Sequence, residues 1–348
     1  MEDVEEPKVV PEKALFADAP VGKAVMSMIL PTVISQIILV IYNLADTWYV
    51  GLTENAYAVA AVSLCLPVYT ILSAISNLFG IGGAGAMARA LGRNDYGKAR
   101  RLLRISLLGA LSGAILYAGF MAVFGRTILW LIGGDTQTIE NAVTYTLWTI
   151  VIGGVLTILS PVCGNLVRAM GKPRAASFGM ILGGLLNILL DPLFMFVLLP
   201  PGNAVAGAAI ATVLSNLAVL VYFLIYLHSC QQKIFEGKPS NGKKKWHPLL
   251  REILKGGIPG FCMVALAMLS NCVLNSMISS LGSEAVAGLG IVRKIDQLAY
   301  AVNQGITQGI LPLVAYCYSS GRRKRMWTAV GIAGICSECV SIICMAVS

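Results

Sequence analysis

Residues 24–50 read AVMSMILPTVISQIILVIYNLADTWYV, and this stretch decides the fold class. Most of it is apolar, and it exceeds the roughly 20 residues that a helix needs to cross a bilayer. Similar runs recur along the chain and predict helices over 24–50, 57–87, 104–131, 140–169, 175–199, 204–228, 251–280, 285–317 and 326–348. Such runs are too long for barrel strands, which alternate over about 10 residues. The sequence therefore predicts an all-α polytopic membrane protein, because a helix satisfies its own backbone hydrogen bonds in lipid.

The composition excludes an ordinary soluble domain. Of the 348 residues, 57% are hydrophobic and 12% are charged, whereas soluble domains carry about 25% charged residues. The mean hydropathy is +0.76. The net charge of +9 does not indicate a nucleic-acid partner, because the basic residues stand in short clusters between apolar runs. That arrangement is typical of membrane topology.

No pattern in the chain indicates an enzyme. The P-loop pattern GxxxxGK[ST] is missing, so ATP-driven transport is not expected. The two histidines, His228 and His247, flank a polar connector, and no nucleophile–base arrangement is visible. The nine cysteines lack the spacing of a metal site and are expected to pack as small hydrophobes. We therefore expect no enzymatic activity and no organic cofactor.

The connectors predict an orientation. Lysine and arginine gather in every second connector, after the predicted helices 57–87, 140–169, 204–228 and 285–317. Because basic connectors stay in the cytoplasm, those connectors and the tail 1–23 are predicted to be cytoplasmic. The tail has no signal-peptide pattern. We expect a multi-pass protein of the bacterial or archaeal plasma (inner) membrane.

The chain divides into two related halves. Pro31 and Pro259 each stand in a long apolar run, and Asn43 and Asn271 each follow twelve residues later, which gives a period of about 228 residues. The predicted organisation is a first lobe at 24–228, a basic linker at 229–250 and a second, partial lobe at 251–348. Internal repeats of this size are typical of secondary transporters.

Acidic residues inside apolar runs are the strongest functional candidates, because an ionisable group at the bilayer centre costs at least about 2.5 kcal/mol. Asp191 follows Asn187 by one helical turn and precedes Pro192, which should kink the helix and free the carbonyl of Ile188. The Asp191 carboxylate, the Asn187 amide and the free carbonyl would suit a proton or Na⁺. The alternative is that the same residues form a structural hydrogen-bond network around the proline kink. Asp46 is predicted to share a face with Gln36 and Asn43, unless it is simply solvated at the helix end.

A second polar group lies in the predicted helix 285–317. Arg293, Lys294 and Asp296 either neutralise one another or face a substrate. Gln304 and Gln308 are one turn apart. The residues predicted to line a substrate cavity are Gln36, Asn43, Arg293, Asp296, Gln304 and Gln308. Glu338, in the predicted helix 326–348, has no assigned role.

Three stretches resemble one known family. Residues 30–99, which begin LPTVISQIILVIYNLADTWYVG, are similar to the opening of a multidrug and toxic compound extrusion (MATE) transporter. Residues 167–194, VRAMGKPRAASFGMILGGLLNILLDPLF, and residues 204–216, AVAGAAIATVLSN, resemble later parts of the same family. The resemblance implies two six-helix lobes around a central cleft. About nine of the twelve helices would then be present, with the second lobe cut short.

The resemblance also implies a function and a site. The protein would be a monomer that exports small amphipathic organic cations in exchange for H⁺ or Na⁺. The DinF-like branch places the coupling ion in the first lobe, and the matching residues are Asp46, Asn187, Asp191 and Thr212, with Tyr145 a weaker match. Na⁺, if it is the driver, would bind at Asp46, Asn187 and Asp191. That branch is favoured because residues 256–280 contain no acidic residue.

Two other functions remain open at this point. A related flippase for lipid-linked precursors would need several basic residues in its cavity to hold a pyrophosphate, and only Arg293 and Lys294 qualify. A non-transporting, shortened membrane protein is the second alternative.

Overall fold

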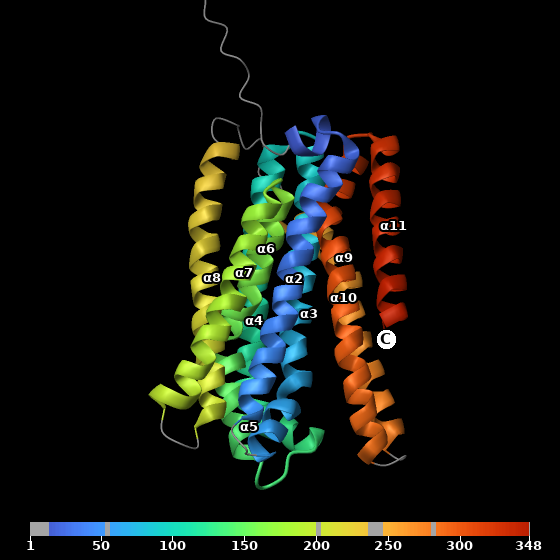
Figure 1. Cartoon of the computed structure of the whole chain (residues 1–348). Helices are drawn as coiled ribbons and strands as arrows, with labels where there is room; N and C mark the ends of the chain where they lie inside the picture. Colours follow the sequence, from blue (N-terminus) through green and yellow to red (C-terminus); the bar gives the residue numbers. More distant parts are fainter. Residues whose placement is uncertain (1–13, 53–55, 200–202, 236–245, 280–282, 348) are drawn as a thin grey trace, which may run out of the picture.

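The structure, a computed structural model, describes residues 14–52, 56–199, 203–235, 246–279 and 283–347, and within these ranges it contains helices and no strand (Figure 1). The α-helices are α2 (Val21–Gly51), α3 (Ala56–Gly92), α4 (Tyr96–Ile132), α5 (Ile139–Thr146), α6 (Gly154–Ala169), α7 (Pro173–Pro192), α8 (Ala204–Phe235), α9 (Trp246–Ser279), α10 (Ser283–Ser319) and α11 (Arg323–Val347). Three π-helical segments accompany them: η1 (Ala14–Asp18), η2 (Leu147–Ile152) and η3 (Leu193–Leu198). The predicted all-helical membrane fold is confirmed.

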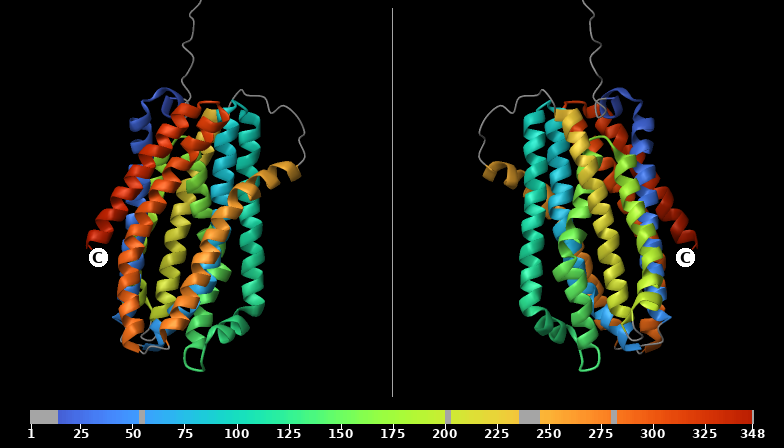
Figure 2. Two further views of the ribbon diagram at one scale, coloured as in Figure 1. Left: turned by 90° about the vertical axis from the view of Figure 1, so that its right-hand side faces the viewer. Right: turned by 90° about the vertical axis from the view of Figure 1, so that its left-hand side faces the viewer.

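Among the described residues, six helices are long and apolar enough to cross a membrane, or seven if one bent pair counts as a single span. The bent pair joins 139–152 to α6 at an angle of 49°. This pair covers the segment that the sequence predicts as one helix over 140–169. The helices α10 and α11 lie alongside these spans and complete the bundle (Figure 2).

Several helices are longer than the apolar runs that predict them. The helix α3 continues to Gly92 rather than 87, and α4 begins at Tyr96 rather than 104. The Asp95 side chain caps α4 by accepting a hydrogen bond of 2.8 Å from the backbone N–H of Lys98. Hydropathy marks only the part of a helix that lies in the membrane, so bounds predicted from hydropathy leave out the charged turns at the helix ends. For the same reason α8 and α9 enter the predicted linker 229–250, of which 236–245 lies outside the described residues.

The α-helix of α7 ends at Pro192, where the sequence predicts a kink. The chain continues as the π-helical segment η3, so the helix changes its hydrogen-bond register there. Proline has no N–H to donate to the preceding turn, and this loss explains the position of the change. Such π segments are often found at functional sites.

One end of the bundle carries the basic turns. The turns α3–α4, α6–α7 and α10–α11 lie together there, and so does η1 (Figures 1 and 2). We call this the basic end, and we call the end with the α4–α5 turn the opposite end. We call residues 14–235 the N-terminal half and residues 246–347 the C-terminal half.

The two halves contact each other mainly through two helix pairs, α3 with α9 and α2 with α10. Glycines allow this close approach: a Cβ on Gly257 would overlap the carbonyl of Leu78, and one on Gly309 would lie 2.9 Å from the Met28 carbonyl oxygen. The contacts agree with the internal repeat. Gly82 lies against Gly257, and Ile29 lies against Gly309. Gly257 follows Ile29 by 228 residues, and Gly309 follows Gly82 by 227 residues, so the two contacts join equivalent positions of the two repeats.

The predicted tail 1–23 is partly built into the fold. Residues Ala14–Asp18 form η1, and α2 already begins at Val21. The Phe16 side chain is fully buried and its ring centroid lies 5.2 Å from that of Tyr316 on α10. The apolar run around Phe16 is too short to read as a helix from hydropathy, and for this reason sequence analysis assigns it to a polar tail.

Candidate functional site

Three helices bring four of the predicted coupling-ion residues into one region of the N-terminal half. The Asn187 amide on α7 donates to Asp191 Oδ1 at 3.2 Å and to Thr212 Oγ1 on α8 at 3.3 Å. Thr212 Oγ1 in turn donates to the Ala208 carbonyl at 3.0 Å. Asp46 on α2 interacts electrostatically with Asp191. The residues that the resemblance selects are therefore neighbours in space.

The Asp191 carboxyl is fully buried, and Asn187 is 2% exposed. Within the described residues, three buried oxygens at this site accept no hydrogen bond: Asp46 Oδ1, Asn187 Oδ1 and Asp191 Oδ2. An unpaired buried acceptor costs about 1–3 kcal/mol, and a charged one costs more. The cluster therefore has spare acceptors and a surplus of negative charge, which a proton or a small cation would compensate.

Three tyrosines interact electrostatically with the acidic residues. Tyr145 on α5, the weaker match, is 9% exposed and interacts electrostatically with Asp46. Tyr42 on α2 and Tyr69 on α3 interact electrostatically with Asp46 as well, and neither is among the residues predicted from the sequence. Tyr42 stands one helical turn before Asp46, which is a signal that could have found it. Tyr69 comes from another helix and no local spacing marks it.

A small cavity adjoins this cluster. Its volume is about 40 Å³, and Tyr42, Asn187, Thr212, Ser215 and Asn216 contribute polar groups to its wall. Because roughly 10–15 Å³ of such volume holds one water molecule, the cavity has room for a few waters or a small hydrated ion. It is far smaller than the roughly 300–1,000 Å³ of sites for drug-sized molecules.

In the part of the chain that the structure describes, no group of three or more His, Cys, Asp or Glu side chains could hold a metal ion. The oxygen donors are two carboxylates, one amide and one hydroxyl, which suit a proton or a monovalent cation.

The residues predicted to line a substrate cavity are spread over α2 and α10. Gln36 and Gln308 meet across the two halves, with 3.2 Å between Nε2 and Oε1. Asn43 donates to the Leu39 carbonyl of its own helix, and Gln304 donates to the Tyr300 hydroxyl of its own helix. Gln36 therefore reaches α10, whereas Asp46 interacts with α7.

Other predicted polar residues lie farther along α10 and on α11. Asp296 and Glu338 are exposed. The side chains of Arg293 and Lys294 lie outside the described residues. No sequence pattern marks Asn303, which accepts a hydrogen bond of 2.6 Å from the Ser337 hydroxyl and so joins α10 to α11.

Comparison with known proteins identifies related sequences. The MatE family model matches residues 31–193 and 259–348. The chain is 30% identical over 336 residues to the multidrug export protein MepA of Staphylococcus haemolyticus, covering 95% of this chain and 73% of that protein. It is 31% identical over 333 residues to MepA of Staphylococcus aureus (strain NCTC 8325 / PS 47), covering 94% and 72%.

Solved structures share the fold. The structure of a MATE protein in the straight conformation matches with a TM-score of 0.88 at 24% identity, covering 98% of this chain and 74% of that chain. An outward-facing multidrug resistance MATE family transporter matches with the same TM-score, identity and coverage. At this identity the match supports the arrangement of helices and not the chemistry of individual side chains.

Proposed function

Because this chain belongs to the MATE transporter family, which the MatE model and the MepA relatives show, we propose that it is a secondary antiporter. In this proposal it exports small amphipathic organic cations in exchange for H⁺ or Na⁺. It lies in the bacterial plasma (inner) membrane as a monomer, with its N-terminus and its basic end in the cytoplasm. The relatives are named multidrug export proteins, and that activity agrees with this proposal.

The observation that carries the proposal is the set of buried oxygens without donors at Asp46, Asn187 and Asp191. Two neighbouring carboxylates in a poorly hydrated region repel each other unless one is protonated or a cation lies between them. A proton would add a donor and remove one charge. Na⁺ would instead be held by the carboxylate and amide oxygens. Either ion would compensate the unpaired oxygens and the excess negative charge of the site.

Coupling follows from the position of Asp191. It occupies the last turn of α7, directly before the change to the π-helical segment η3. Binding or loss of an ion there changes the charge beside a helix that is already irregular. An ion that binds one arrangement of the two halves more tightly shifts the equilibrium toward it, by at most its difference in affinity.

The substrate needs a separate location. The cavity beside Asn187 holds about 40 Å³, too little for an organic cation. We place the substrate between the halves, where Gln36 and Gln308 form a neutral polar contact. The substrate and the coupling ion then act on each other through the relative position of the halves.

Efflux of ethidium tests this proposal in energised cells that lack other exporters. We expect efflux that stops with a protonophore if H⁺ is the driver, or with Na⁺ replacement if Na⁺ is the driver. Asp46→Asn and Asp191→Asn should each abolish it, because an amide neither binds a proton at neutral pH nor balances a cation. Unchanged efflux in both variants would refute the coupling site, and absence of efflux in the unmodified chain would favour the flippase or non-transporting alternatives.

Asp135→Asn is the matched control for these variants. Asp135 stands in the α4–α5 turn outside the membrane-spanning helices, where the Thr138 hydroxyl and backbone N–H groups hold the pKa of its carboxyl below the usual value. It is therefore charged at neutral pH, like an ordinary surface carboxylate. Asparagine can accept the same backbone hydrogen bonds, so this variant removes a charge and should keep full efflux.

A further inference from the structure

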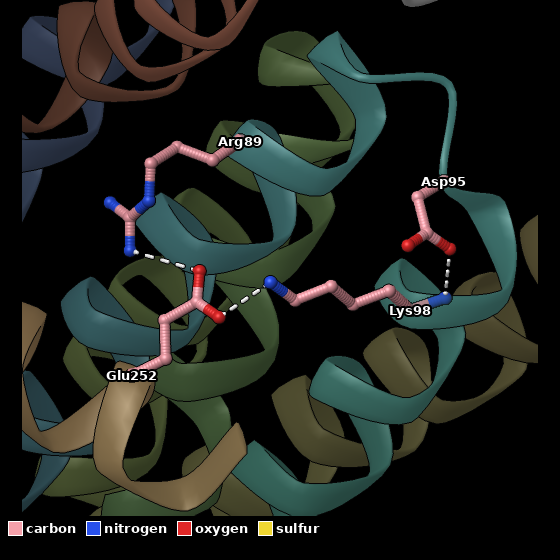
Figure 3. A network of polar contacts seen from close by, with 4 residues as sticks. All are labelled: Arg89, Asp95, Lys98 and Glu252. Atoms are coloured by element: carbon pink, nitrogen blue, oxygen red, sulfur yellow. Dashed lines mark hydrogen bonds and ion pairs between the residues drawn. The ribbon is translucent and has the colours of Figure 1, made fainter. Parts of the chain in front are cut away.

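The basic end carries a group of charged contacts that join the two halves. Glu252 in the first turns of α9 accepts from Lys98 of α4, with 2.6 Å between Nζ and Oε2. Its other oxygen, Oε1, lies 3.6 Å from Arg89 Nη2 of α3. Figure 3 shows both cations reaching the same carboxylate, with Asp95 capping the helix that carries Lys98. Both partners of Glu252 belong to the N-terminal half.

A second contact joins the halves at the same end through the N-terminal segment. Arg322 in the α10–α11 turn donates to the Ala17 carbonyl at 2.6 Å, and Arg325 Nε on α11 donates to the Phe16 carbonyl at 2.7 Å. The Phe16 ring packs on Tyr316 of α10. Because the segment leads directly into α2, these bonds tie α2 to the C-terminal half.

Close glycine packing lies beside these contacts. Just after Glu252 along α9, the helices α3 and α9 meet through Gly82 and Gly257, and α2 and α10 meet at Gly309. Glycines let the backbones of these helices approach closely, so the two halves pack tightly here. Toward the opposite end the ribbons of α9 and α10 already move away from α2 (Figure 1). The halves are thus closest toward the basic end, where the glycine packing and the charged contacts both lie.

The charged contacts are of a strength that permits opening. The side chains of Arg89, Lys98 and Glu252 are 29%, 20% and 27% exposed. Partly exposed ion pairs regain water when they separate, so each contributes little to stability. A fully buried pair would hold the halves shut, because breaking it strands a charge in a dry interior.

We propose that Glu252 with Arg89 and Lys98, together with the Phe16 segment held by Arg322 and Arg325, forms a releasable gate at the basic end. The gate is closed in this structure and must open for the other access state. This inference rests on the proposed transport function only in that a transporter has two access states. Its test measures the separation of the halves and needs neither substrate nor coupling ion.

The experiment measures a distance across the gate by pulsed electron paramagnetic resonance in lipid nanodiscs. Spin labels are attached to a ketone-bearing amino acid that replaces Arg93 in the α3–α4 turn and Lys324 on α11, both of which are exposed. This chemistry leaves the native cysteines untouched. The unmodified gate should give one dominant short distance.

Glu252→Gln should raise the ratio of the population at the long distance to that at the short distance by about 2- to 10-fold, because it removes two partly exposed ion pairs. Glu140→Gln is the matched control: it breaks the 2.6 Å pair with Arg126, which lies wholly within the N-terminal half, and should change nothing. Adding Lys98→Gln to Glu252→Gln should produce no further shift. If Glu252→Gln behaves like Glu140→Gln, or if the two changes add fully, the ion-pair part of the gate is wrong.

Arg325→Lys tests the role of the Phe16 segment, because it keeps the positive charge and does not create a large cavity. Lysine cannot reproduce the Nε geometry, so the long distance should again increase, whereas Arg323→Lys at an exposed neighbouring position should not alter it. Equal distributions in these two variants would overturn the role of the N-terminal segment. The distances remain informative even if the ethidium experiment shows no efflux, so the two proposals can fail separately.

Discussion

Asn187 organises the candidate ion site at the scale of single residues. Its amide nitrogen donates to both Asp191 and Thr212, while its own oxygen accepts no hydrogen bond. One neutral side chain therefore sets the positions of a carboxylate on its own helix and a hydroxyl on α8. The hydroxyl is held in turn by the Ala208 carbonyl.

Thr212 offers a test of this arrangement that leaves the charges alone. Thr212→Val keeps the shape but removes the acceptor of the Asn187 amide, whereas Thr212→Ser keeps the hydroxyl. A hydrogen bond of this kind contributes about 0.5–1.5 kcal/mol. Half-maximal ethidium efflux in the valine variant should therefore need roughly 2- to 10-fold more of the coupling ion. Equal ion dependence in the valine and serine variants would show that Thr212 does not contribute.

At the scale of helices, the contact between α3 and α9 depends on glycine. A Cβ on Gly257 would overlap the backbone of Leu78, which cannot move as a flexible side chain could. The same helix pair carries Glu252 and Arg89 at its basic end. The small residues thus determine how closely the charged residues approach.

Gly257→Ala should destabilise the protein by about 1–3 kcal/mol, because overpacking against backbone forces a shift of the helices. Gly331→Ala on α11 is the control, since nothing lies within 4 Å of its added Cβ. Replacing a glycine inside an open helix should be neutral or stabilising by about 0.5–1 kcal/mol. Thermal melting in detergent measures both, and equal melting temperatures would contradict the close-packing interpretation.

At the scale of the whole molecule, the basic turns lie at one end of the bundle and the α4–α5 turn lies at the other (Figure 1). Positive residues are retained on the cytoplasmic side during insertion. The proposed orientation therefore places Arg93 inside the cell and Asp135 outside.

A membrane-impermeant thiol reagent checks this orientation. In intact cells Asp135→Cys should be labelled, and Arg93→Cys should be labelled only after permeabilisation. The unmodified chain is the control for reaction at native cysteines, of which Cys262 and Cys339 are exposed. The reverse pattern would invert the proposed topology and would place the Glu252 gate on the outer side.

The sequence by itself determines the helical membrane fold, the alternation of basic connectors and the internal repeat. These are local or periodic properties: a long apolar run has no other stable state in lipid. The pairing of Asn187 with Asp191 is also local, because residues four apart share a helix face. By contrast, Asp46 and Thr212 enter the predicted site only through a family resemblance, since no spacing along the chain relates them to Asp191.

Only the tertiary structure decides which residues meet between distant segments. It pairs Gln36 with Gln308 and Glu252 with Lys98, and it brings Tyr69 into electrostatic interaction with Asp46. It also buries Phe16, which hydropathy assigns to a polar tail, because Tyr316, Arg322 and Arg325 come together around it. These contacts depend on how the two halves pack, and that geometry is set by helix crossing and glycine approach rather than by any pattern that a single segment carries.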